Sequence, residues 1–227
     1  MKKNMAFAAV LGYCISLILF SSVLLTLEAR GEEMKTINLP QPKLKGAVSV
    51  EEAIQKRRSV RGYASKDISL EDVSQLLWAC QGITEPKRAL RAVPSAGALY
   101  PLEIYIAKKD GVFHYIPKGH KLEVLSDKNV KAEIAEASLG QSYVEEAAVD
   151  IIICALYDRI TSRYGERGVM YADMEAGHAA QNVFLQAVAL GLDSVPIGAF
   201  KEEAVAKILN LPRGTRPIYI LPVGYKK

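Results

Sequence analysis

The sequence is poor in the residues that build metal centres and disulfide scaffolds. Its 227 residues include only 3 cysteines and 3 histidines. Cys14, Cys80 and Cys154 lie far apart, form no Cys-x-x-Cys motif and show no metal-ligand spacing. Cys80 and Cys154 sit in apolar stretches, so we expect buried thiols without a disulfide. The sequence therefore predicts no metal site.

Groups for conventional side-chain catalysis are equally scarce. His114, His120 and His178 are isolated from one another, and none belongs to a recognisable catalytic triad. His178 lies in an alanine-rich helical stretch, where a packed core histidine is the expected role. The sequence thus shows no conventional catalytic cluster.

The sequence also lacks a large excess of positive or negative charge. The formal net charge is +4, and no basic block is interleaved with aromatic residues. This pattern gives no reason to expect nucleic acid as a partner. Internal repeats and low-complexity tracts are absent as well, so the length predicts one domain with an N-terminal appendage.

The appendage comprises residues 1–33. Lys2 and Lys3 precede an uncharged, mainly apolar run of 23 residues, 5–27, which is long enough to span a bilayer as a helix. We interpret it as a signal peptide or an N-terminal membrane anchor, which would place residues 34–227 outside the cytoplasm. If translation instead starts at Met34, the protein is cytoplasmic.

Capping patterns and hydrophobic periodicity predict the elements of the remaining chain. A capping box at Ser49 predicts a helix to about Arg58, and a second one at Ser69 predicts a helix that ends at Gly82. Asp110-Gly111 predicts a hairpin turn. An extended arm is expected at 38–45. Strands are expected at 102–108, 112–116, 149–156 and 216–223, with a further short strand that ends at Val195. Helices are expected at 127–139, 171–190 and 202–210. Helices and strands without strict alternation indicate the α+β class.

Positive charge gathers just beyond the first of these helices. Arg57, Arg58, Ser59 and Arg61 offer three guanidiniums and a hydroxyl within five positions, a set that suits a phosphate group. A basic helix end that merely complements the helix dipole is the alternative. Ser59 and Arg61 favour the phosphate, because they alternate in an extended segment where the dipole no longer acts.

A second informative stretch is Pro94-Ser95-Ala96-Gly97-Ala98-Leu99-Tyr100-Pro101. Small residues between two prolines predict a turn that lets the backbone approach a flat ligand. Together with the arginine-rich segment, this stretch resembles the flavin-binding signatures of the nitroreductase family. The similarity is greatest to the branch related to the dehydrogenases that form thiazole and oxazole rings in peptides.

The resemblance implies FMN as cofactor and assigns residues to it. The phosphate is expected at Arg57, Arg58, Ser59 and Arg61, and the ring and ribityl chain at Pro94, Ser95, Ala96, Gly97 and Ala98. Val195-Pro196-Ile197-Gly198-Ala199-Phe200 looks like the family loop whose amides face flavin N5, which implicates Pro196, Ile197, Gly198 and Ala199. Lys226 is a further candidate for the phosphate.

The family also implies a fold and an assembly. It has a nitroreductase-like fold, with a mixed, mainly antiparallel sheet flanked by helices, in an intertwined homodimer. Ala172, Ala176, Gly177, Ala179 and Ala180 would let the long helix pack closely at the core of that dimer. Close packing inside one subunit explains these small residues equally well.

By resemblance, we expect an oxidoreductase that passes hydride from NAD(P)H, or another electron donor, through FMN to a nitroaromatic, quinone or flavin. The substrate pocket is expected to include Tyr100, Tyr164, Arg167 and Tyr171. One alternative is an FMN-dependent dehydrogenase of an azoline-type peptide. The Lys-Tyr pair of the azole-forming relatives, however, occurs nowhere in this sequence. A flavin-binding module without turnover is the other alternative.

Overall fold

The computed structural model describes residues 35–227. The expected signal peptide or membrane anchor, residues 1–33, lies outside this range, as does Cys14. Within residues 35–227, no helix combines the length and the apolar character needed to cross a membrane.

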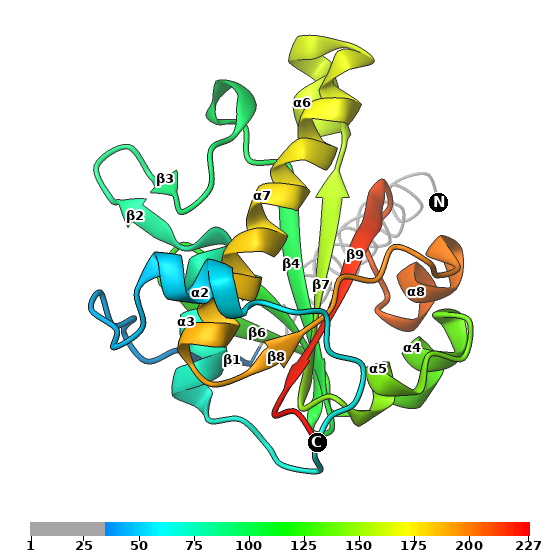
Figure 1. Ribbon diagram of the computed structural model, residues 1–227. Helices are drawn as coiled ribbons and strands as arrows, with labels where there is room; N and C mark the ends of the chain where they lie inside the picture. The colour runs from blue at the N-terminus through cyan, green and yellow to red at the C-terminus, as the bar shows by residue number, and fades with distance from the viewer. Residues whose placement is uncertain (1–34) are drawn as a thin grey trace, which may run out of the picture. The chain divides into compact units, whose positions relative to one another are not determined.

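A seven-stranded sheet forms the centre of the domain, in the order β1-β6-β5-β4-β7-β9-β8, with every neighbouring pair antiparallel. Figure 1 shows its central strands running the length of the domain. The strands are β1 (Thr36–Asn38), β4 (Leu102–Lys108), β5 (Gly111–Ile116), β6 (Lys121–Ser126), β7 (Val149–Leu156), β8 (Asp193–Ser194) and β9 (Thr215–Gly224). A separate two-stranded hairpin joins β2 (Ile83–Glu85) to β3 (Leu90–Arg91).

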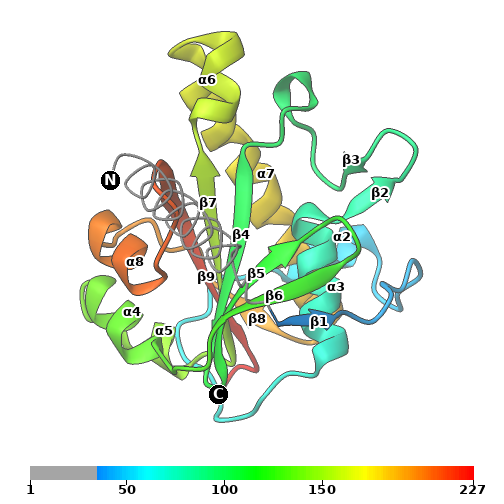
Figure 2. The same cartoon turned by 180° about the vertical axis from the view of Figure 1, so that it is seen from behind.

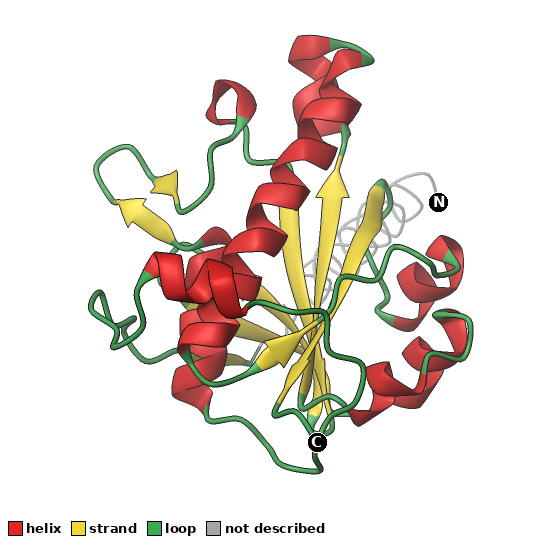
Figure 3. Cartoon of the chain, viewed as in Figure 1, coloured by secondary structure: helices red, strands yellow, loops and turns green. Residues whose placement is uncertain are grey.

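Helices cover both faces of the sheet, as Figures 1 and 2 show from opposite sides. One group is α2 (Val50–Lys56), α3 (Leu70–Gln81) and α7 (Arg167–Ala189), and the other is α4 (Lys131–Ala137), α5 (Ser142–Glu146) and α8 (Glu202–Ile208). Strand β7 is apolar along nearly its whole length because its side chains alternate between the two cores: Ile151 and Ile153 face one, Ile152 and Cys154 the other. The predicted α+β class with helices flanking an antiparallel sheet is confirmed (Figure 3).

Local signals placed the first two helices and the hairpin correctly. The hydroxyls of Ser49 and Ser69 accept hydrogen bonds from the amides three residues later, so both act as N-caps. The predicted hairpin joins β4 to β5 at Gly111. Its φ is +144°, and a Cβ atom there would lie 2.2 Å from the Ser126 carbonyl oxygen, so only glycine fits.

Two predicted helices differ from the structure. The helix expected at 127–139 is shorter, and α5 follows it, because Leu139 and Gly140 adopt positive φ and reverse the chain. The helix expected at 171–190 begins earlier, at Arg167, without a side-chain cap that the sequence could have revealed.

Strand β6 and helix α6 (Asp158–Tyr164) were not predicted. The alternation of β6 is weak, and α6 lacks a capping side chain at Tyr157. Both cysteines of the described range are buried free thiols, as predicted. The expectation for His178 was wrong, because its side chain is exposed on α7 rather than packed in the core.

A buried polar network ties the arm before α2 to the sheet. The Leu39 amide donates to the His120 carbonyl at 3.0 Å. His120 Nε2 lies 2.6 Å from the Ser74 hydroxyl and 3.1 Å from the Pro40 carbonyl. His120 Nδ1 lies 2.8 Å from the Tyr115 hydroxyl. Burial lowers the pKa of His120 below its usual value of 6.5, although the Pro40 carbonyl opposes the shift.

His120 should therefore make the protein less stable in acid. Because the pKa of His120 is lower in the folded protein than in the unfolded chain, the unfolded chain binds more protons near pH 6. The contribution of neutral His120 to the free energy of unfolding is therefore fully present above pH 6.5. It is lost as the pH falls through the folded-state pKa. Urea unfolding of wild type and His120→Asn from pH 8 to pH 5 measures it. Asparagine tolerates the φ of +48° at this position. The stability difference between the two proteins should shrink toward low pH, and a constant difference would contradict the assignment.

Candidate functional site

Four cationic residues lie along the segment that follows α2 and on the C-terminal segment beside it. We call Arg57, Arg58, Arg61 and Lys226 the basic cluster. Residues far apart in sequence meet here because Tyr63 pairs with Lys226 in an antiparallel bridge and the Lys227 amide donates to the Gly62 carbonyl. Within residues 35–227, no member of the basic cluster forms an ion pair with a carboxylate.

The members of the basic cluster differ in their surroundings. Arg58 folds back and donates to the carbonyls of Gln55 and Arg57 at 2.9 and 2.7 Å, so it caps the end of α2, as the helix-dipole alternative predicted for this residue. Arg61 and Lys226 are exposed, and Arg57 is partly exposed. Ser59 is exposed beside them and forms a parallel bridge with Ser194.

A buried tyrosine fixes the backbone that carries these charges. The Tyr63 hydroxyl donates to the carbonyls of Val60 and Pro222 at 2.9 and 3.1 Å, and the side chain is only 1% exposed. The Ser194 hydroxyl donates to the same Pro222 carbonyl at 2.7 Å. Burial raises the pKa of the Tyr63 hydroxyl, so it stays a neutral donor. Segment 59–63 is therefore held firmly against β8 and β9.

The segment 196–199 runs beside β9 in the same protomer. Ile197 pairs with Ile220 and is buried, whereas Pro196, Gly198 and Ala199 are exposed. The Gln141 side-chain amide donates to the Ala199 carbonyl at 3.0 Å. Within the part of the chain that the structure describes, the backbone amides of Gly198 and Ala199 donate no hydrogen bond. Two backbone donors of an exposed segment are thus left without an acceptor among the described residues.

The loop 94–101 has a strained backbone. Gly97, Ala98 and Tyr100 have φ of +62°, +53° and +48°, and the last two lack the freedom of glycine. Hydrogen bonds hold this shape: the Tyr100 amide donates to the Ser95 hydroxyl at 2.9 Å, and Arg159 donates to the Tyr100 carbonyl at 2.6 Å. Strain that the surroundings maintain in this way is typical of functional loops.

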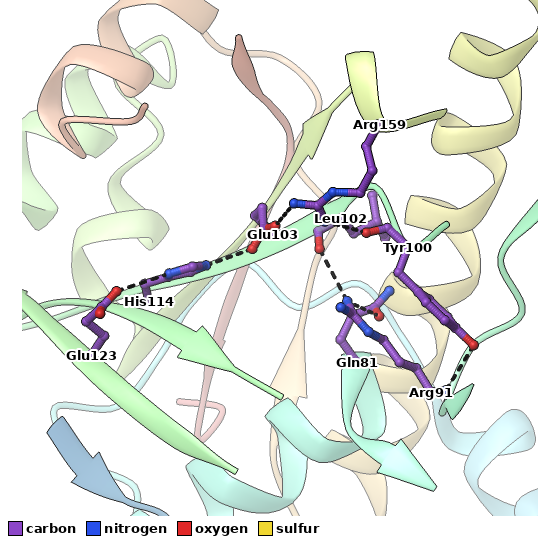
Figure 4. Close-up of polar contacts among 8 residues, drawn as sticks. All are labelled: Gln81, Arg91, Tyr100, Leu102, Glu103, His114, Glu123 and Arg159. Carbon is purple, nitrogen blue, oxygen red and sulfur yellow. Dashed lines mark hydrogen bonds and ion pairs between the residues drawn. The ribbon is translucent and has the colours of Figure 1, made fainter. Parts of the chain in front are cut away.

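A polar network supports this loop from the sheet (Figure 4). Arg159 donates to the Glu103 carboxylate at 2.5 Å, and the other oxygen of Glu103 is 2.9 Å from His114 Nε2. Glu123 lies 3.5 Å from the other ring nitrogen of His114. The hydrogen bonds from His114 and Arg159 hold the pKa of Glu103 below its usual value despite burial. The loop is therefore anchored to three strands through charged groups.

Sequence reasoning missed Glu175, which lies under the same loop. Its side chain is 1% exposed, one oxygen accepts from the Gln81 amide at 3.3 Å, and Oε2 has no partner among the described residues. Burial raises the pKa of Glu175, against opposing interactions with Ser95 and Gln81. A carboxylate between Ala172 and Ala176 on the core-facing side of a helix was the available signal.

The expected substrate-pocket residues fall into two groups. Tyr164 and Tyr171 pack edge to face at 5.3 Å between ring centroids, and the Arg167 guanidinium carbon lies 5.7 Å from the Tyr171 ring centroid. Tyr100 lies apart from them, with its hydroxyl accepting from the Arg91 amide at 3.1 Å and its ring below the Arg91 guanidinium. Tyr100 therefore helps to anchor the loop to which it belongs.

One protomer does not bring all predicted cofactor residues together. The loop 94–101 leads into β4 at Leu102, which pairs with Ala155 of β7. Ser59, by contrast, bridges to Ser194. Ser194 pairs with Val223 of β9, which in turn pairs with Val149 of β7. Ala155 and Val149 are six residues apart on β7, or about 20 Å at about 3.3 Å per residue. Ile197 pairs with Ile220, which pairs with Ile152, so segment 196–199 lies about midway between the basic cluster and the strained loop.

Comparisons with known proteins identify the family. Residues 54–225 match the family model described as "Nitroreductase family". A nitroreductase-like protein of Methanocaldococcus jannaschii is 42% identical over 185 residues, covering 79% of this chain and 92% of that protein. The microcin B17-processing protein McbC of Escherichia coli is 27% identical over 159 residues, covering 65% of this chain and 58% of that protein.

Two further matches extend the picture. The FMN reductase [NAD(P)H] of Bacillus subtilis is 24% identical over 186 residues, covering 74% of this chain and 62% of that protein. The crystal structure of a nitroreductase-like protein from Ralstonia eutropha superposes with a TM-score of 0.78 at 24% identity, covering 88% of this chain and 93% of that one. At this level of identity the structural match shows the fold alone.

Proposed function

The chain belongs to the nitroreductase family, and we propose that it is an FMN-dependent oxidoreductase. FMN would supply the redox chemistry, its N5 atom accepting hydride from NAD(P)H before electrons pass to an electron-poor acceptor such as a nitroaromatic, a quinone or a flavin. Donor and acceptor would use the same open face in turn, which gives a ping-pong cycle. The observation that carries the proposal is the basic cluster without carboxylate partners.

The basic cluster fits a phosphate monoester. Arg57, Arg61 and Lys226 come from two distant parts of the sequence and form no ion pair within residues 35–227, although Lys226 interacts electrostatically with Asp193. An anion with several oxygens relieves the repulsion among these cations and accepts the guanidinium donors. Tyr63 and Ser194 hold the backbone in place, so little ordering is required on binding.

The segment 196–199 suits the flavin ring. Its free amides at Gly198 and Ala199 lie in the same protomer as the basic cluster, so both ends of one cofactor could be held by one chain. At Gly198 an added Cβ atom would meet only the Tyr219 ring, at 3.7 Å. The protein leaves that side open, which supports close approach of a planar ligand. These residues bind and orient, and no side chain is assigned an acid, base or nucleophile step.

A second copy of the chain would complete the site. About 20 Å of strand, at about 3.3 Å per residue, separates the strained loop 94–101 from Ser59, and we expect a partner's loop to cover the ring. Helix α7 offers a surface for this contact, since Val169 and Met174 are 39% and 52% exposed. Gly177 and His178 are exposed on the same helix, whereas Ala172, Ala176, Ala179 and Ala180 pack inside the subunit.

Met174→Arg tests the homodimer. A cation on the exposed face of α7 would be desolvated between two copies, so we expect the variant to sediment as a monomer and to lose FMN. Leu125→Arg on β6 is the matched control, because Leu125 is likewise exposed, at 39%, away from α7. A Met174→Arg protein that remains dimeric in analytical ultracentrifugation and keeps its flavin would contradict this interface.

A peptide azoline dehydrogenase is the second candidate function. The match to the microcin B17-processing protein favours it. The missing Lys-Tyr pair speaks against it, and so does the match to the FMN reductase of Bacillus subtilis. Oxidation of an azoline-containing peptide by the purified protein, without NAD(P)H, would distinguish this activity from the proposed one.

The visible spectrum of the purified full-length protein is the first test of the proposed function. We expect flavin absorption, FMN as the heat-released cofactor on chromatography, and anaerobic bleaching by NADH or NADPH. A protein with bound FMN that neither nicotinamide reduces would favour a flavin-binding module or a different electron donor. A colourless protein that takes up no added FMN would refute the cofactor assignment.

A further inference from the structure

Two arginines near the strained loop have no ion-pair partner among residues 35–227, and one of them, Arg167, belongs to the expected substrate pocket. Arg163 lies in the last turn of α6, and Arg167 is the first residue of α7. In Figure 1 this corner projects at the top of the domain, beyond the end of β7. Together with Tyr164 and Tyr171, these two residues form what we call the arginine–tyrosine cluster.

Both guanidiniums of this cluster are free of carboxylates. Arg163 and Arg167 are exposed, and neither forms an ion pair within residues 35–227. Arg159, one turn earlier on α6, differs because it is bound by Glu103 and the Tyr100 carbonyl. Arg167 also stands at the N-terminal end of a helix, where a cation opposes the helix dipole. Helix stability therefore does not explain it.

Aromatic rings hold the two guanidiniums in place. The Arg163 guanidinium carbon lies 5.4 Å from the Tyr164 ring centroid, and that of Arg167 lies 5.7 Å from the Tyr171 centroid. The two tyrosine rings support each other edge to face at 5.3 Å. These distances lie within cation–π range, so the rings attract both guanidiniums while the N–H groups remain available to a ligand.

The cluster touches the loop proposed to cover the flavin. A Cβ atom built on Gly97 would lie 2.8 Å from the Tyr164 hydroxyl and 2.9 Å from Arg163 Nη1. Glycine is thus needed here for its φ of +62° and for the close approach of both side chains. A molecule that stacks on the ring beside this loop would meet the Arg163 guanidinium.

We propose that a substrate of this enzyme carries an anionic group, and that Arg163 and Arg167 bind it. The inference rests on the proposed function and adds a substrate class to it. Two exposed guanidiniums without ion-pair partners within residues 35–227, each next to one ring of the Tyr164–Tyr171 pair, are matched by a carboxylate, sulfonate or phosphate, which accept bidentate hydrogen bonds. The anion belongs either to the acceptor or to the 2′-phosphate of NADPH. The two guanidiniums would bind either anion through the same kind of hydrogen bond, and the experiment below distinguishes the two sources.

The experiment compares matched substrate pairs in wild type and in Arg163→Gln/Arg167→Gln. The acceptor pair is 4-nitrobenzoate and nitrobenzene, and the donor pair is NADPH and NADH. We expect the ratio of kcat/KM for the anionic member over the neutral one to fall about 10- to 100-fold in the variant for one of the pairs. Because each ratio is compared between two proteins, differences in reduction potential between the compounds cancel.

The outcomes are distinct. A fall confined to the acceptor pair places the anion on the acceptor, and a fall confined to the donor pair places it on NADPH. Lys118→Gln/Lys128→Gln removes the same charge from the β5–β6 turn and the segment after β6, and it should leave both ratios unchanged. Unchanged ratios in the arginine variant overturn the inference.

Binding provides a readout that does not depend on turnover. Calorimetric titration of the FMN-loaded protein with 4-nitrobenzoate and with NADP⁺, which carries the 2′-phosphate but cannot reduce the flavin, should show weaker binding of one of them to the arginine variant than to wild type. Absence of turnover with both nicotinamides would contradict the proposed function alone. Equal binding of both compounds by the two proteins would overturn the present inference.

Discussion

Arg57→Ala combined with Arg61→Ala is expected to weaken FMN binding by roughly two to four orders of magnitude. Each substitution removes a charge-assisted hydrogen bond of about 1.5–3 kcal/mol, and 1.4 kcal/mol corresponds to a factor of ten. The backbone of this segment is held by Tyr63 rather than by either arginine, so the fold should persist. Fluorescence titration of the apoprotein with FMN measures the loss, and circular dichroism checks the fold.

A control separates this effect from a general loss of positive charge. Lys118→Ala with Lys128→Ala removes the same charge from exposed positions near β6, which three strands separate from β9. This variant should bind FMN like wild type. Unchanged FMN affinity in the arginine variant would mean that the phosphate lies elsewhere and that the basic cluster is a solvated surface.

Lys131→Met is expected to destabilise the fold by about 3–5 kcal/mol at neutral pH. The buried ammonium group donates to the Asp150 carboxylate at 2.9 Å and to the carbonyls of Val144 and Ala147 at 2.8 and 2.6 Å. It thereby ties α5 and the start of β7 to α4. Removing it leaves a fully buried carboxylate without a cation and two carbonyls without a donor.

The cost should depend on pH. Burial raises the pKa of Asp150 to about 7, and Lys131 opposes the shift. Below that pH the folded protein carries Asp150 protonated, so the loss of the cation matters less. Urea unfolding should thus show a smaller effect of Lys131→Met at pH 5 than at pH 8.

Two variants control for packing and charge. Lys131→Met/Asp150→Asn removes the unpaired charge and should recover part of the lost stability at pH 8, while Lys128→Met changes an exposed lysine and should cost little. An equal loss at both pH values, without recovery in the double variant, would show that the ion pair is not what stabilises this region.

Local sequence predicted those features whose cause is local. Ser49 and Ser69 cap helices through hydrogen bonds that span three residues, so the sequence alone revealed them. The break between α4 and α5 was missed because it depends on Leu139 adopting positive φ, which the residue type disfavours. Helix α6 was missed because it begins without a capping side chain.

In the candidate site, too, some features could be predicted from the sequence and others depend on tertiary packing. Arg57 to Arg61 could be identified as a phosphate-binding segment because the charges are adjacent in sequence. The environment of Glu175 could not, because a carboxylate buried under the loop 94–101 is produced by the packing of α3 against α7. The free amides of Gly198 and Ala199 likewise depend on how segment 196–199 meets β9.

The sequence by itself determined the family, the α+β class and the residue types at the cofactor site, since these follow from short motifs and from hydrophobic periodicity. Tertiary structure alone decided which motifs meet. Antiparallel pairing of β7 with β4 and β9 brings Lys226 beside Arg61 and carries the strained loop about 20 Å away, at about 3.3 Å per residue. Strand register is set by contacts between distant residues, so no local pattern could reveal how far apart these motifs lie.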